Sequence, residues 1–295
     1  MRAYFECYPC FLRQALSAAR RVGASEAQRG VVLRAVLALL QDISPDTTPP
    51  EVAYHVHRIV RETISAADPY QQAKAESTAE ALALYPKLKR LVAESADPLD
   101  TAIRISIAGN IIDFGATEVI ADLWPAVERV LEQPYAIDHS AQLRARLENV
   151  DQVLYLGDNA GETVFDRVLI EALPIPVFYV AKGGPILNDA TITDAVAAGL
   201  DQCTTLLDNG SNAPGTVFSL CSEAFRSRYT RAPLVIAKGQ ANYESLSEAG
   251  DKVFCLLRVK CPVIGEDIGQ PVDGIVVRQS GQERIQHDKD HLRCQ

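Results

Sequence analysis

The chain has 295 residues, of which 47% are hydrophobic and 23% are charged, and its formal net charge is −9. A chain of this length can form one large or two modest domains with buried cores. The acidic balance argues against non-specific binding to nucleic acid, which needs an excess of Lys and Arg on one face. The sequence has no run of 18 apolar residues and no signal-peptide core at its start. We therefore expect a cytoplasmic protein with no membrane partner.

The candidate ligands for a soft metal are few. Seven cysteines are spread through the chain, and this odd number predicts free thiols rather than a disulfide framework. Cys7 and Cys10 form a CxxC pair, which could share a metal ion or act as a redox couple, or could simply pack at the start of a helix. His55 and His57 are two residues apart and point to different faces of a helix, so we expect ordinary helix histidines.

Residues 11–95 have the apolar periodicity of packed helices. The expected helices include residues 11–19, 31–40 and 51–66, and a fourth that begins near Tyr70. Asp97 and the proline after it end this pattern. We predict a helical N-terminal domain, residues 1–96, and an α/β domain, residues 97–295, whose first part, residues 97–140, is a helical linker.

Two polar residues follow the first helix of this linker. Asn110 and Asp113 lie between Gly109 and Gly115. A loop of this kind can bring both side chains to a cleft and thus to a bound phosphate. Helix capping and turn formation explain the same residues equally well.

After residue 142, short apolar runs alternate with helical segments, which is typical of a parallel sheet with crossover helices. The expected strands are Val153–Leu156, Val177–Val180, Thr204–Leu207, Leu234–Ala237, Val253–Leu257 and Ile275–Val277. We expect the last of them at an edge of the sheet. The predicted fold class is α/β, with a mostly parallel Rossmann-like sheet and crossover helices, preceded by an all-helical N-terminal region.

Polar residues follow each of the first five expected strands. The segments that follow begin at Asp158, Lys182, Asp208, Lys238 and Arg258. In a parallel sheet the carboxyl ends of the strands lie along one edge, where ligands bind. Five polar segments at this edge indicate an active-site crevice.

These segments carry the groups needed for phosphate chemistry. Oxygen ligands from Asp158, Asn159 and Asp189 suit Mg²⁺ or Mn²⁺. Lys238 and Lys260, beside backbone N–H groups, could receive a phosphate. A metal ion, a phosphate receptor and a water molecule suffice for phosphoryl transfer to water.

Each residue also has a structural explanation. Asp and Asn are common N-cap residues, and a lone lysine is usually solvated at the surface. Their convergence on one edge of the sheet favours a site. Glu162, which follows the Asp-Asn pair, could support that site or could only stabilise the first turn of the next helix.

Five ordered motifs make the sequence resemble a known family, the metal-dependent damage-control phosphatases once described as domain of unknown function eighty-nine. The motifs are Gly157 to Glu162, Gly184 to Thr191, Lys238 to Glu244, Asn110 to Phe114, and Lys260 to Pro262. The CxxC pair is similar to the archaeal and bacterial branch of the family. Ala241 stands where a glycine is common.

The resemblance implies a helical N-terminal region packed on an α/β domain, and a divalent metal ion, Mg or Mn with Co or Ni possible, bound by Asp158, Asn159 and Asp189. It implies hydrolysis of phosphate monoesters of small metabolites, such as sugar phosphates or damaged phosphometabolites, with Lys238 on the phosphate. The further residues expected at the phosphate are Asn110, Asp113, Asn188, Gly239, Asn242, Glu244 and Lys260.

The residues alone leave two other functions open. One is an α/β enzyme that binds a nucleotide cofactor, such as a methyltransferase. The other is a non-catalytic metabolite-binding module. For the phosphatase, the sequence leaves open whether Asp158 is only a ligand or also a nucleophile.

Overall fold

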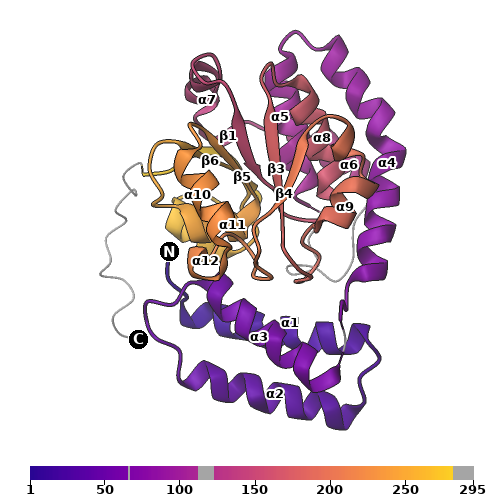
Figure 1. Ribbon diagram of the computed structural model, residues 1–295, viewed down its shortest axis with the longest axis vertical. Helices are drawn as coiled ribbons and strands as arrows, with labels where there is room; N and C mark the ends of the chain where they lie inside the picture. The colour runs from indigo at the N-terminus through magenta and orange to yellow at the C-terminus, as the bar shows by residue number, and fades with distance from the viewer. Residues whose placement is uncertain (66, 112–122, 282–295) are drawn as a thin grey trace.

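Three N-terminal helices, α1 (Tyr8–Arg21), α2 (Glu26–Gln41) and α3 (Pro49–Ile64), form a group beside a larger α/β part in the computed structural model of the chain (Figure 1). The structure describes residues 1–65, 67–111 and 123–281. Among them, no helix has the length and apolar character that a membrane crossing requires.

Three long helices form the N-terminal region. A short 3₁₀ segment, η1 (Phe5–Cys7), precedes α1 (Tyr8–Arg21), α2 (Glu26–Gln41) and α3 (Pro49–Ile64). Ser25 and Thr48 begin α2 and α3 with capping boxes, in which the side chains of Gln28 and Glu51 bond back to the cap. The third helix starts two residues before the predicted one, because Pro49 suits a first helical position.

The apolar faces of these helices meet in a core of their own. Phe11, Val36 and Val56 are buried in it, and so are Ile186 and Leu187, which come from the loop after strand β3 (Val177–Ala181). The N-terminal region therefore packs directly on a loop of the α/β part.

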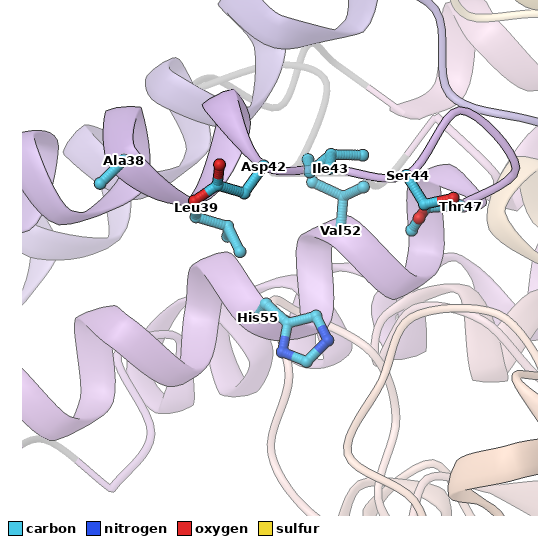
Figure 2. A pocket seen from close by; sticks show the side chains of 8 residues that line it. All are labelled: Ala38, Leu39, Asp42, Ile43, Ser44, Thr47, Val52 and His55. Carbon is cyan, nitrogen blue, oxygen red and sulfur yellow. The ribbon is translucent and has the colours of Figure 1, made fainter.

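The histidines of α3 have structural positions. His57 is fully enclosed and, among the described residues, its Nε2 has no hydrogen-bond partner. Burial lowers its pKa to about 3, so it is neutral at pH 7. His55 lines a pocket of about 400 Å³ between α2 and α3, together with mostly apolar residues such as Leu39, Ile43 and Val52 (Figure 2).

Helix α4 (Gln71–Glu94) connects the two parts. Ala73, near its start, joins the N-terminal core, while Ala81 and Leu88 pack in the core of the sheet. The predicted domain boundary after residue 96 stays a prediction. Helices α5 (Pro98–Gly109) and α6 (Leu123–Glu132) follow, in agreement with the predicted helical segment after Pro98.

The sheet has seven strands in the order β1-β7-β6-β5-β2-β3-β4 among the described residues. The strands are β1 (Tyr135–Asp138), β2 (Val153–Leu156), β3, β4 (Thr205–Asp208), β5 (Val235–Lys238), β6 (Val253–Arg258) and β7 (Ile275–Gln279). Strands β2 to β6 run parallel to one another, which confirms the predicted α/β class with a mostly parallel sheet.

Two details of the sheet prediction were wrong. Strand β7 is internal rather than at an edge, because it pairs antiparallel with β6 and parallel with β1. Strand β1 lies in the segment predicted as a helical linker. Tyr135–Ile137 are only partly buried and Asp138 is exposed, unlike the fully buried residues of β2 and β5.

Helices cover both faces of the sheet. One face packs with residues of α4, α5, α6, α8 (Glu162–Ala172), α7 (Ser140–Leu147) and α9 (Ile192–Ala197). The other face packs with α10 (Glu223–Arg231), α11 (Gly239–Leu246) and α12 (Pro262–Ile268). Short 3₁₀ segments, η2 (Leu200–Gln202) and η3 (Phe218–Leu220), flank β4. Strand β2 lies in the middle of the parallel strands, so the segment after it reaches the centre of the carboxyl edge.

Candidate active site

The turn after β2 is held against the loop after β3 by backbone contacts. Asn159 and Asp189 form an isolated antiparallel β-bridge. The N–H of Ala190 donates to the carbonyl oxygen of Asp158 at 2.7 Å, and the N–H of Ala160 donates to that of Asn188 at 2.9 Å. The structure thus brings together the three predicted metal ligands, Asp158, Asn159 and Asp189. Each of these residues is at most 5% exposed.

One oxygen of Asp158 is fixed by two amides. Its Oδ2 accepts from Nδ2 of Asn159 at 3.0 Å and from Nδ2 of Asn110 at 3.1 Å. Gly239 lies against the same oxygen with a φ of 78°, and a Cβ atom there would lie 1.8 Å from it. Glycine is therefore required at this position both for the left-handed backbone and for the space that the carboxylate occupies.

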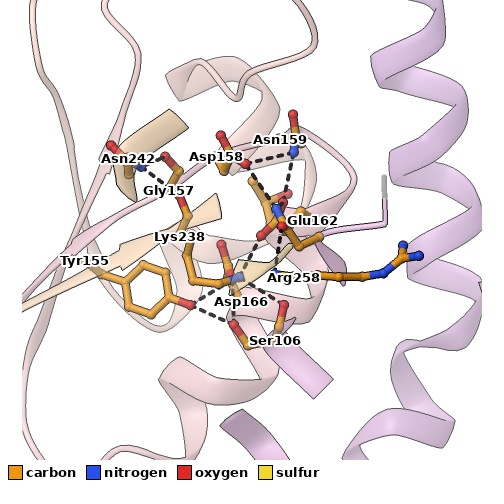
Figure 3. A network of polar contacts seen from close by, with 12 residues as sticks. Ser106, Tyr155, Gly157, Asp158, Asn159, Glu162, Asp166, Lys238, Asn242 and Arg258 are labelled. Atoms are coloured by element: carbon orange, nitrogen blue, oxygen red, sulfur yellow. Dashed lines mark hydrogen bonds and ion pairs between the residues drawn. The ribbon is translucent and has the colours of Figure 1, made fainter. Parts of the chain in front are cut away.

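Glu162, at the first turn of α8, connects these residues to the interior. Its Oε2 accepts from the amide nitrogens of Asn110 and Asn159, each at 3.0 Å, and its Oε1 accepts from Nζ of Lys238 at 2.7 Å (Figure 3). Both amide nitrogens therefore face carboxylates. In Figure 3 the side-chain oxygen of Asn159 points away from this network, which suits a metal ligand.

Lys238 lies under this layer and has no exposed surface. Its three N–H donors are directed at Glu162 Oε1 at 2.7 Å, Asp166 Oδ1 at 2.5 Å and the carbonyl oxygen of Ser106 at 3.0 Å. The predicted contact of Lys238 with phosphate stays a prediction. In this arrangement such a contact requires the ammonium group to leave one of its internal acceptors.

The lower part of the network surrounds Asp166. Its Oδ1 also accepts from the hydroxyls of Tyr155 at 2.7 Å and Ser106 at 3.0 Å. Burial raises the pKa of Asp166, although Lys238 opposes that rise. Burial lowers the pKa of Lys238, but the charges of Asp166 and Glu162 outweigh it, so the net pKa lies above that of an ordinary lysine.

A second buried lysine lies beside Asp189. Lys182 is the first residue after β3, and its Nζ lies 3.4 Å from Oδ2 of Asp189 and donates to the carbonyl oxygen of Gly215. The Lys182 residue is 4% exposed. The Asp-Asn pair thus has Lys238 below it, and Asp189 has Lys182 beside it.

The other predicted phosphate residues have different surroundings. Asn242 is buried and donates to the carbonyl oxygens of Lys238 at 2.8 Å and Gly157 at 3.3 Å, so it supports the backbone of the site. Asn188 is also buried. Glu244 accepts from the side chain of Gln240 at 3.1 Å, and the backbone N–H of Lys260 donates to the same Gln240 side chain at 3.2 Å. Asp113 lies outside the described residues.

The charges of the site favour a divalent cation. Four carboxylates, those of Asp158, Glu162, Asp166 and Asp189, are buried with two ammonium groups, those of Lys182 and Lys238. The formal charges of these six described residues sum to −2, which a bound divalent cation would balance. Among the described residues no three His, Cys, Asp or Glu side chains form a metal site, so the third ligand here would be the amide oxygen of Asn159.

The CxxC pair is at a helix start, one of the two readings left open by the sequence. Cys7 is the N-cap residue of α1, and Cys10 lies in its first turn. Burial raises the pKa of the Cys7 thiol to about 11. A thiol with this pKa is almost entirely protonated at pH 7, which disfavours a redox role.

The sequence analysis left the role of Glu162 open and missed several other residues of this site. Asp166 is four residues after Glu162 in α8 and therefore on the same face of the helix, a spacing that could have paired them. Lys182 directly follows β3, and Lys238 is the last residue of β5. The reasoning that placed Lys238 at the carboxyl edge of the sheet therefore applied to Lys182 as well. Ser106 and Tyr155 stand among apolar residues in the sequence, so the sequence did not indicate that they belong to a polar site.

Comparisons with known proteins identify a family with the same sequence pattern. Residues 3–276 match the sequence model of the damage-control phosphatase ARMT1-like domain. A damage-control phosphatase from Pyrococcus horikoshii is 29% identical over 282 residues, which cover 94% of this chain and 97% of that protein. One from Archaeoglobus fulgidus is 33% identical over 248 residues, with coverage of 81% and 85%.

A solved structure has the same fold. The crystal structure of a DUF89 family protein from Pyrococcus horikoshii superposes with a TM-score of 0.86 at 28% sequence identity, covering 95% of this chain and 99% of that one. An uncharacterized protein from Methanocaldococcus jannaschii is 33% identical over 287 residues, with coverage of 93% and 94%. The similarity extends over the helical N-terminal region as well as the sheet.

Proposed function

This chain belongs to the damage-control phosphatase family with an ARMT1-like domain and is a phosphatase, and we propose that it hydrolyses phosphate monoesters of small metabolites with a divalent metal ion. The observation that carries the proposal is the buried set of Asp158, Asn159 and Asp189, which lies among four buried carboxylates and two buried lysines. We also keep a cytoplasmic location as part of the proposal, since the cysteines at described positions are free thiols.

The donor set suits a hard cation. Asp158 and Asp189 would contribute carboxylate oxygens and Asn159 its amide oxygen, which are the ligands that Mg²⁺ and Mn²⁺ prefer. When bound, such a cation supplies positive charge beside the phosphoryl oxygens and lowers the pKa of water. Sugar phosphates and damaged phosphometabolites remain the proposed substrates.

The remaining residues would keep the ligands in place. Asn110 and Glu162 fix the position of one Asp158 oxygen and the orientation of the Asn159 amide. Lys238 holds Glu162 and Asp166 from below, so we assign it a positioning role through those carboxylates. A preorganised set of this kind needs little rearrangement when charge develops on the transferring phosphoryl group.

The test is metal-dependent release of phosphate. Protein stripped with EDTA would be reloaded with Mg²⁺, Mn²⁺, Co²⁺ or Ni²⁺ and assayed on p-nitrophenyl phosphate and a panel of phosphorylated metabolites. We expect kcat/KM of the Asp158→Asn variant to fall by at least ~100-fold, because one anionic ligand is lost.

A matched control is available on the same edge of the sheet. Asp208 ends β4, is exposed, and accepts from the N–H of Gly210 at 2.8 Å, a contact that asparagine can keep. Asp208→Asn should leave kcat/KM unchanged. Full turnover by Asp158→Asn, or turnover that EDTA does not reduce, would remove the proposal.

A further inference from the structure

The two buried lysines of the site differ in how many of their donors are used. An ammonium group has three N–H donors. The three acceptors of Lys238 use all of its donors, and its side chain is fully enclosed. Among the described residues, Lys182 has one hydrogen-bond acceptor, the carbonyl oxygen of Gly215, and one longer ion pair with Asp189 at 3.4 Å. Lys182 therefore has a donor left for a ligand.

Lys182 also lies closer to the carboxyl edge of the sheet. It directly follows β3 and bridges to Thr191 beside the loop that carries Asp189. Lys238 instead points inward to Asp166 and to the carbonyl oxygen of Ser106 in α5. A phosphate drawn to a cation on Asp189 would lie beside Lys182, whereas the Asp166 and Glu162 carboxylates stand around the ammonium of Lys238.

Backbone hydrogen bonds hold the loop around Lys182 in place. The N–H of Gly183 donates to the carbonyl oxygen of Ser211 at 2.8 Å and to Oδ1 of Asn209 at 3.1 Å. A Cβ on Gly183 would lie 2.6 Å from the backbone of Gly210, so the loops after β3 and β4 are in direct contact. Lys182 is thus held by its own loop and by the loop that provides Gly215, which limits the entropy lost when it binds a ligand.

We propose that Lys182, rather than Lys238, is the lysine that binds the phosphoryl group of the substrate. The proposal rests on the proposed phosphatase function and assigns one contact within it. Lys182 would donate to a phosphoryl oxygen of the ester and of the phosphate product, a charge-assisted hydrogen bond. Its ion pair with Asp189 would hold the ammonium group beside the metal ligand.

The experiment measures binding of inorganic phosphate by calorimetry, without turnover. Lys182→Gln removes the charge but keeps a donor for the carbonyl oxygen of Gly215, and Lys182→Met removes both. In protein loaded with Mn²⁺, both variants should bind phosphate at least ~10-fold more weakly than the wild type, since a charge-assisted bond is lost. Lys182→Arg should recover part of the affinity. Mn²⁺ affinity should stay within about threefold of the wild type, since Lys182 is not a ligand.

Lys252 provides the control, since its Nζ also donates to a backbone carbonyl oxygen, that of Tyr229 at 2.7 Å, at the other end of β5 and β6. Lys252→Met should leave phosphate affinity unchanged. Phosphate affinity of folded Lys182→Gln equal to that of the wild type would overturn the proposal. A parallel loss of Mn²⁺ and phosphate affinity would also overturn it, because Lys182 would then act through Asp189.

Failure of this inference can be told from failure of the proposed function. If the wild type binds and releases phosphate while Lys182→Gln binds it equally well, only the role of Lys182 is wrong. If the wild type releases no phosphate with any metal, the proposed function itself fails. The binding measurement on the variants does not depend on which ester is the substrate.

Discussion

Gly239 provides a sharp test of how closely the site is packed. Its φ of 78° is left-handed, which costs a residue with a side chain about 1–2 kcal/mol. In Gly239→Ala, the new Cβ would lie 1.8 Å from Oδ2 of Asp158, whereas real Cβ atoms essentially never approach a neighbour below 3.0 Å. The two atoms must therefore move apart by about 1.2 Å.

Asp158 cannot withdraw without breaking its contacts with Asn110 and Asn159. A misplacement of ~1 Å in a catalytic arrangement costs about 100-fold in rate. We expect Gly239→Ala to lower kcat/KM for phosphate release by at least ~100-fold and Mn²⁺ affinity by about 10-fold to 100-fold. Unfolding in urea should show a loss of more than ~1–2 kcal/mol, since the clash adds to the backbone cost.

A substitution of Gly23 serves as a control, because it has the energetic cost of a left-handed backbone without a steric clash. Gly23 has a similar φ of 68°, is exposed, and a Cβ there would meet nothing within 4 Å. Gly23→Ala should lose about 1–2 kcal/mol of stability and keep full activity and metal affinity. If Gly239→Ala and Gly23→Ala have the same kcat/KM and the same Mn²⁺ affinity, the packing of Gly239 against Asp158 does not govern the site.

Two further predictions concern stability. Lys238→Met should lower the free energy of unfolding in urea by about 3–5 kcal/mol, because it leaves the carboxylates of Glu162 and Asp166 buried without their counter-ion, and an unchanged free energy would contradict the buried ion-pair assignment. His57 binds a proton in the unfolded chain below about pH 6.5, but in the folded protein only near pH 3. The contribution of neutral His57 to the free energy of unfolding is therefore complete above pH 6.5 and falls by up to about 1.4 kcal/mol per pH unit as the pH decreases. The free energy of unfolding of His57→Phe should therefore fall less steeply between pH 6.5 and 5 than that of the wild type, and equal slopes would show that His57 is not buried as a neutral group.

Local sequence patterns were sufficient to predict most of the secondary structure. The strand Val153–Leu156 was located to the residue, because four apolar side chains buried on both faces of a parallel sheet leave a continuous run. Asp158 and Asn159 directly follow that strand, so their place at the carboxyl edge depended only on strand direction. The partly buried β1 left no such run, and without β1 the internal position of β7 could not be foreseen.

The tertiary structure decided which partner each charged group has. Lys238 and Lys182 both lie where a strand meets its following loop, and the sequence gives no reason for one to turn inward. The inward direction of Lys238 depends on Ser106 of α5 and Asp166 of α8, residues 132 and 72 positions away in the chain. The sequence determined which residues reach the edge of the sheet, because that depends on local pattern and strand order. Only the packing of α5 and α8 against the sheet determined which carboxylates surround each ammonium group, because a buried charge is directed by the nearest opposite charge in space.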